Sequence, residues 1–107
     1  MPVYMIQAAY TPEALATIIN KPQNRFAAIK SSLENLGGRL KDAYFTFGKY
    51  DLVIIAEMPD NVSAVAVAMA FSAGGAVKSL HTTPLITGDE AMEAMKKASK
   101  ANYRPPS

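Results

Sequence analysis

The sequence predicts an α+β protein of the ferredoxin-like type, in which the order β-α-β-β-α-β builds a four-stranded antiparallel sheet with helices on one face. Two observations indicate this class. Strand-like patterns occur near the start, in the middle and in the last third of the 107-residue chain, and helical patterns separate them. Two Gly-Gly pairs stand where helices should stop. Residues 88–107 add a C-terminal helix and tail, so we expect a single domain over residues 1–107.

The first third of the chain predicts a strand followed by an interrupted helix. Residues 3–10 are partly β-branched and aromatic, as in a strand, and Thr11 followed by Pro12 fits the start of a helix. The proline at the end of residues 20–22 should end this first helical segment. A second segment is predicted up to Gly37-Gly38, because four apolar residues recur at helical spacing: Phe26, Ile29, Leu33 and Leu36.

The middle of the chain predicts a hairpin. Residues 39–47 alternate, as in a half-buried strand. Three residues lie on one side (Ala43, Phe45 and Phe47) and three on the other (Asp42, Tyr44 and Thr46). Gly48-Lys49 should reverse the chain, and residues 50–58 form the next strand. The centre of this strand, residues 52–56, is apolar at every position, which implies cover on both faces of the sheet.

The last part of the chain predicts a helix, a strand and a final helix. Asp60 should cap a helix that is apolar nearly all round, and Gly74-Gly75 should end it. In the strand over residues 76–83, alternation places Val77, Ser79, His81 and Thr83 opposite Lys78, Leu80 and Thr82. We expect the final helix to run from about Asp89 to Ala101, with Met92 and Met95 facing the body.

Composition excludes several classes of site. The chain has no cysteine and one histidine, so it can form neither a thiolate nor an all-histidine metal site, and we expect no metal and no cofactor. The formal net charge is +2, but four of the cations lie in residues 96–104. The body is therefore not basic, and we expect no nucleic-acid partner. Residues 62–73, the longest apolar segment, are too short to span a membrane. Without a targeting signal at the start, a cytoplasmic location is expected.

The predicted topology leaves one face of the sheet open. The first and third strands are central in this arrangement, and helices cover only one side of them. Since residues 52–56 indicate cover on both sides and the chain has no spare element, we expect a second copy to supply it. The protein should therefore be a homodimer or a higher homo-oligomer.

Polar side chains gather on the predicted open face. If Leu52 points to the helices, then Asp51 and Glu57 point to the open face, and Tyr44 and His81 join them. A carboxylate beside an imidazole is typical of acid-base chemistry, so His81, Glu57 and Asp51 are the catalytic candidates. The alternative is that these side chains satisfy backbone groups or water across a subunit interface. Gln7 belongs to the same face if its strand has the expected parity.

The segment after Gly48 also permits two interpretations. Tyr50 and Asp51 could contact a ligand, or Tyr50 could pack at the entrance of the strand while Asp51 binds neighbouring amides. The candidate ligand-binding set on these grounds is Tyr44, Tyr50, Asp51, Glu57 and His81.

Five short motifs resemble those of the GYD-domain family. They are Tyr4, Tyr10-Thr11-Pro12-Glu13, Leu36-Gly37-Gly38, Gly48-Lys49-Tyr50-Asp51 and Glu57-Met58-Pro59-Asp60. The resemblance covers residues 2–88 and implies a ferredoxin-like, dimeric α/β-barrel fold among small bacterial proteins of unassigned biochemistry. It makes Gly48, Tyr50 and Asp51 characteristic positions, with Lys49 between the first two, and it assigns no catalytic residue.

Three functions are compatible with these patterns. The first is an oligomeric α/β-barrel protein that binds a small organic ligand in a cavity between the sheet face and the subunits. The alternative is a metal-free enzyme that transfers a proton on a small aromatic or carbonyl compound. A third is a regulatory protein that acts through the final helix and the basic tail.

Overall fold

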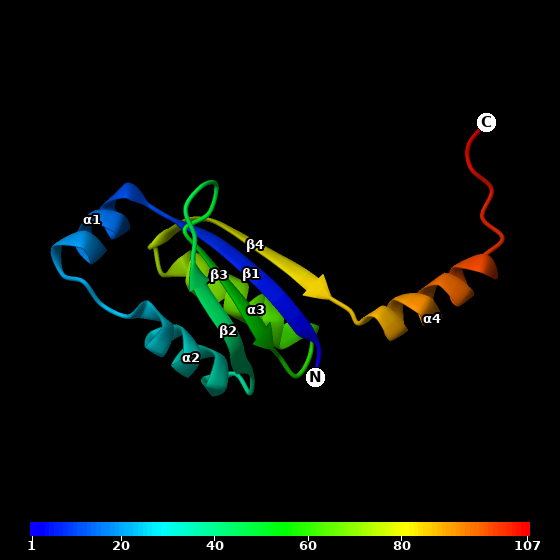
Figure 1. The fold of residues 1–107 in the computed structure, drawn as a ribbon, viewed down its shortest axis with the longest axis horizontal. Coiled ribbons are helices and arrows are strands. Elements are labelled where there is room, and N and C mark those ends of the chain that lie inside the picture. The colour runs from blue at the N-terminus through cyan, green and yellow to red at the C-terminus, as the bar shows by residue number, and fades with distance from the viewer.

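The computed structural model describes residues 1–107 and contains four strands and four helices (Figure 1). In chain order they are β1 (Val3–Tyr10), α1 (Pro12–Asn20), α2 (Arg25–Asn35), β2 (Arg39–Phe45), β3 (Leu52–Glu57), α3 (Asn61–Ala73), β4 (Val77–Leu85) and α4 (Gly88–Ser99). The predicted α+β class is confirmed. The interruption expected around Pro22 separates α1 from α2.

The sheet has the strand order β2-β3-β1-β4, and every neighbouring pair is antiparallel. β1 and β3 are therefore central, as the sequence predicts. Side-chain caps start the helices that the sequence indicates: Thr11 accepts from the Ala14 N–H, and Asp60 accepts from the Ser63 N–H. These caps satisfy backbone donors that have no partner inside a helix.

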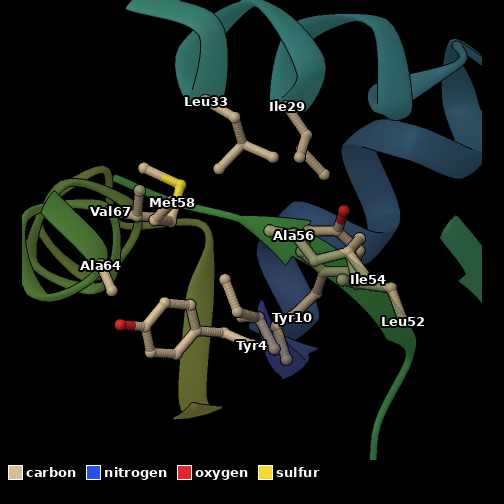
Figure 2. Close-up of a cluster of buried hydrophobic side chains, with 12 residues drawn as sticks. Tyr4, Tyr10, Ile29, Leu33, Leu52, Ile54, Ala56, Met58, Ala64 and Val67 are labelled. Atoms are coloured by element: carbon tan, nitrogen blue, oxygen red, sulfur yellow. The ribbon is translucent and has the colours of Figure 1, made fainter. Parts of the chain in front are cut away.

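The core lies between one face of the sheet and helices α2 and α3. Leu52, Ile54 and Ala56 of β3 are buried on this face, as the sequence predicts. Ile29 and Leu33 of α2 point toward the strands (Figure 2). The other members of the buried cluster are Tyr4, Ile6, Ala8, Tyr10, Met58, Ala64 and Val67. The helix layer thus covers one face of the sheet and leaves the other open.

Two strands differ in detail from the prediction. β2 ends at Phe45, so Phe47 lies outside it and is fully exposed, because the chain turns away from β3 after residue 45. The pairing of β1 with β4 shifts register between Ala9 and Tyr10. As a result Val77 packs against the core and does not share the face of His81.

The edge strands carry irregular features. β2 has a register shift between Leu40 and Asp42 where it pairs with β3. β4 extends two residues beyond the predicted end at Thr83 and contains Pro84, which pairs in register with Tyr4. Proline is tolerated here because β4 is an edge strand.

The C-terminal helix corrects one prediction. α4 leaves the body beyond the end of β4, and none of its residues is buried (Figure 1). The sequence predicts that Met92 and Met95 face the body, but both are exposed, because α4 continues away from the sheet after only Ile86 and Thr87. The molecule is consequently elongated: its radius of gyration is 17.1 Å, against about 13 Å for a compact domain of this length. None of the helices is both long and apolar enough to cross a membrane.

Candidate functional site

The open face of the sheet carries a row of side chains that crosses all four strands. The register pairs Tyr44 with Val53, Val53 with Gln7, and Gln7 with His81. The structure thus brings Tyr44, Gln7 and His81 into one row on the open face. Gln7 lies on this face because its strand has the parity that the sequence analysis expected. Tyr44 and His81 stand at opposite edges of the sheet, with two strands between them.

Glu57 lies on the same face but in a different row. It pairs in register with Val3, whereas His81 pairs with Gln7. The two rows are four residues apart along β1, or about 13 Å at the rise of an extended strand. Glu57 is therefore not the carboxylate beside His81 that acid-base chemistry would need.

Glu57 instead forms ion pairs with two cations of β2. Its Oε1 lies 2.6 Å from the Arg39 guanidinium and 3.8 Å from Lys41 Nζ. The hydrogen bond from Arg39 holds the pKa of the Glu57 carboxyl below its ordinary value. Glu57 is thus a stable carboxylate at neutral pH, which suits an ion pair and does not suit a proton donor.

Asp51 serves the backbone. Its Oδ2 accepts from the Tyr10 N–H at 2.8 Å, at the point where the register of β1 shifts. The Asp51 main chain also donates to the Ala8 carbonyl oxygen and accepts from the Thr46 N–H, both at 2.8 Å. Asp51 therefore joins the end of β1 to the loop between β2 and β3, which matches the backbone-binding interpretation of this segment.

A cavity of about 210 Å³ lies on the helix side of the sheet, between α2, α3 and the central strands. Its lining is mostly apolar, with Ile6 and Ile54 from the central strands and Ala70 and Phe71 from α3. The polar or partly polar side chains in the lining are those of Tyr10, Arg25 and Ser32. An apolar cavity with a few polar groups is the usual form of a small-molecule site.

Tyr10 and Arg25 give this cavity its chemistry. Burial raises the pKa of the Tyr10 hydroxyl, and the charge of Asp51 acts in the same direction. The nearby Arg25 guanidinium lowers the same pKa but does not cancel the effect of burial. The Tyr10 hydroxyl therefore stays protonated at neutral pH and can donate a hydrogen bond beside a fixed positive charge.

No pattern in the sequence predicts this cavity, because it arises from the spacing of α2 and α3 over the sheet. One local signal is nevertheless present. Arg25 is the first residue of α2, where the helix dipole disfavours a cation. A charge placed against a local preference is a common mark of a functional position.

The chain has no group of three or more His, Cys, Asp or Glu side chains that could hold a metal ion.

A family model described as the GYD domain matches residues 4–95. The chain belongs to the GYD-domain family.

Solved structures share the fold of this GYD-domain protein at low sequence identity. TTHA0845 from Thermus thermophilus has a TM-score of 0.54 at 16% identity, covering 82% of this chain and 96% of its own. FFRP-DM1 has a TM-score of 0.50 at 15% identity, covering 80% of this chain and all of its own. A hypothetical protein from Pyrococcus horikoshii, PHS023, has a TM-score of 0.51 at 15% identity, covering 81% of this chain and 92% of its own. No curated protein matches the sequence.

The residues that name the GYD domain lie together at one end of the sheet. Gly48 has φ +137°, a conformation that other residues rarely adopt, in the turn between β2 and β3. Lys49 Nζ lies 5.7 Å from the centre of the Tyr50 ring. The Tyr50 carbonyl oxygen accepts from the Thr46 hydroxyl, and Asp51 binds the Tyr10 N–H. In this GYD-domain protein residues 48–51 therefore organise the hairpin between β2 and β3 and position Tyr10, which lines the cavity.

Proposed function

We propose that this protein binds a small organic anion in the cavity between α2, α3 and the sheet. The observation that carries the proposal is the pairing of one cation, Arg25, with one protonated phenol, Tyr10, at a mostly apolar cavity. A carboxylate would accept hydrogen bonds from both groups, and an apolar body would contact Ile6 and Phe71. Such a site selects for a negative end and an apolar body.

The size of the cavity limits the ligand. An apolar cavity of roughly 150 Å³ accommodates benzene, and this cavity measures about 210 Å³. An aromatic acid with one ring, or a branched aliphatic acid of similar volume, fits this space.

Ligand binding is favoured over proton-transfer catalysis. Tyr10 stays protonated and is a donor rather than a base, Glu57 is held as a carboxylate by Arg39, and the register separates Glu57 from His81.

The remaining open-face candidates, Tyr44 and His81, are proposed to contact a second copy. Half-buried apolar side chains at the centre of that face, Met5, Val53 and Ile55, support such an association in a homo-oligomer.

Binding of benzoate, measured by calorimetry, tests the proposal. We expect the wild-type protein to bind benzoate and to bind neutral benzyl alcohol more weakly. Arg25→Gln should weaken benzoate binding at least about tenfold, because hydrogen bonds to charged groups contribute about 1.5–3 kcal/mol. Lys30→Gln removes an exposed cation from the same helix and is the matched control, with unchanged binding.

Two outcomes would contradict the proposal. The first is equal binding of benzoate and benzyl alcohol, and the second is equal weakening by Arg25→Gln and Lys30→Gln.

A native mass spectrum of the same samples reports the number of 11.5 kDa chains and any bound mass. A single bare chain would contradict the proposed association.

A further inference from the structure

The outer face of α3 carries an exposed apolar stripe. Val62, Val65 and Met69 follow one another at helical spacing and are 79%, 55% and 68% exposed. They line a shallow groove together with Asn61 and Ala66. Residues 61–75 contain no charged side chain. A helix that is apolar on both faces is normally covered on both, and here the sheet covers only one.

A second unpartnered stripe lies on α4. Met92 and Met95 are 56% and 67% exposed, Ala91 lies one turn before Met95 on the same face, and Ala98 extends that face by one turn after Met95. The opposite face is charged, with Glu90, Glu93 and Lys97, and Lys96 borders the stripe one turn after Met92. α4 is therefore an amphipathic helix whose apolar side has no partner within its own chain.

The two stripes match in length. The α3 stripe spans Val62 to Met69 and the α4 stripe spans Ala91 to Ala98, eight residues each, so the ends of each stripe lie about 10 Å apart at the rise of an α-helix. Valines and methionines on one side can pack against methionines and alanines on the other, since methionine adapts to irregular gaps. The chain thus carries both halves of a helix-helix contact.

The start of α4 keeps the two halves apart within one chain. Only Ile86 and Thr87 connect β4 to α4. Thr87 and Glu90 form a capping box, in which the side chain of each binds the backbone N–H of the other at 3.1 Å. This cap begins α4 directly after the connection, and the helix extends away from the body (Figure 1). Short connections of this kind favour the exchange of an element between copies.

The exposed surface of the chain has the size that such an exchange requires. The accessible surface is 7572 Å², against about 5,800 Å² for a compact monomer of 11.5 kDa. The excess of about 1,800 Å² per chain is larger than the roughly 800 Å² that each partner buries in an interface of standard size. The excess reflects the elongated shape, in which no residue of α4 is buried, and it leaves room for an interface of standard size.

We propose that α4 of one copy docks on α3 of a second copy, with Met92 and Met95 packed against Val62, Val65 and Met69. The contact is reciprocal, because each copy supplies both stripes, so a two-fold dimer contains it twice. The contact uses the outer face of α3 and the apolar stripe of α4, and it is separate from the open face of the sheet.

Disulfide formation tests this contact cleanly because the chain has no cysteine of its own. Val65→Cys and Met95→Cys are prepared as separate proteins, one with a tag that changes its mass, then mixed and oxidised. We expect most of the protein to form the mixed covalent dimer. Lys97→Cys in place of Met95→Cys is the matched control, since Lys97 belongs to the charged face of α4, and it should form little mixed dimer.

Two results would overturn the proposal. One is an equal yield of mixed dimer from Met95→Cys and Lys97→Cys, which would show that random collision forms the disulfide. The other comes from the double variant Val65→Cys/Met95→Cys at low concentration. If this variant forms a disulfide within one chain while the separate proteins form no mixed dimer, α4 folds back on its own α3.

Discussion

Replacing Asp51 by alanine should destabilise the protein through the backbone, whatever ligand it binds. The Asp51 carboxylate accepts from the Tyr10 N–H at 2.8 Å, beyond Ala8, which is the last residue of β1 to pair with β3. An amide left without an acceptor in a partly buried position costs about 1–3 kcal/mol. In a domain of this size each kcal/mol corresponds to about 4–8 °C in Tm.

Asp51→Asn separates the hydrogen bond from the charge. The amide oxygen of asparagine still accepts, but a hydrogen bond to a charged acceptor is roughly twice as strong as a neutral one. We expect the free energy of unfolding to follow the order wild type, Asp51→Asn, Asp51→Ala. Urea denaturation followed by circular dichroism measures this order.

Hydrogen exchange gives an independent readout at the atom concerned. The Tyr10 N–H should exchange faster in Asp51→Ala than in the wild-type protein, while the Ile54 N–H at the centre of the sheet should respond only to global stability. The reasoning is refuted if Asp51→Ala unfolds with the wild-type free energy. It is also refuted if the Tyr10 N–H keeps its protection in a destabilised Asp51→Ala.

Three further substitutions test the packing and the pH dependence. A methyl group at Gly38 would lie 2.6 Å from the Glu57 carbonyl oxygen, so Gly38→Ala should cost about 1–3 kcal/mol by overpacking. At Gly74 the nearest atoms are 3.5 Å away, and Gly74→Ala should leave the urea midpoint nearly unchanged. The Ser63 N–H lowers the pKa of Asp60 below 3.8, so its stabilising contribution is present above pH 3.8 and is lost as the pH falls through the folded pKa. Asp60→Asn keeps the cap, and its unfolding free energy should fall less steeply below pH 3.8 in acid titrations.

Local patterns predicted the strands and helices because each pattern has a local physical cause. The alternation around Ile54 follows from the two-residue repeat of a strand, and the caps at Thr11 and Asp60 follow from unpaired helix amides. The same parity predicted which face carries Glu57 and His81. It could not predict their separation, because that depends on the register between strands distant in the sequence.

Features that depend on the packing of distant elements were not predictable from the sequence. The cavity beside Tyr10 depends on how α2 and α3 sit over the sheet. The displacement of Val77 depends on an irregularity in the pairing of β1 with β4. The prediction that Met92 and Met95 face the body is wrong, since both are exposed, because periodicity indicates only that an apolar face needs a partner. It does not say whether that partner belongs to the same chain.

The irregular edge strands have a consequence for how this protein avoids aggregation. An edge strand with free N–H and C=O groups can recruit a strand from another chain. Here one edge contains Pro84, which has no N–H to donate, and the other is interrupted between Leu40 and Asp42 and flanked by the charges of Arg39 and Lys41. Both edges thus oppose extension of the sheet into a fibre. A chain with this much exposed apolar surface can then associate through its faces and helices without a matching risk of uncontrolled strand pairing.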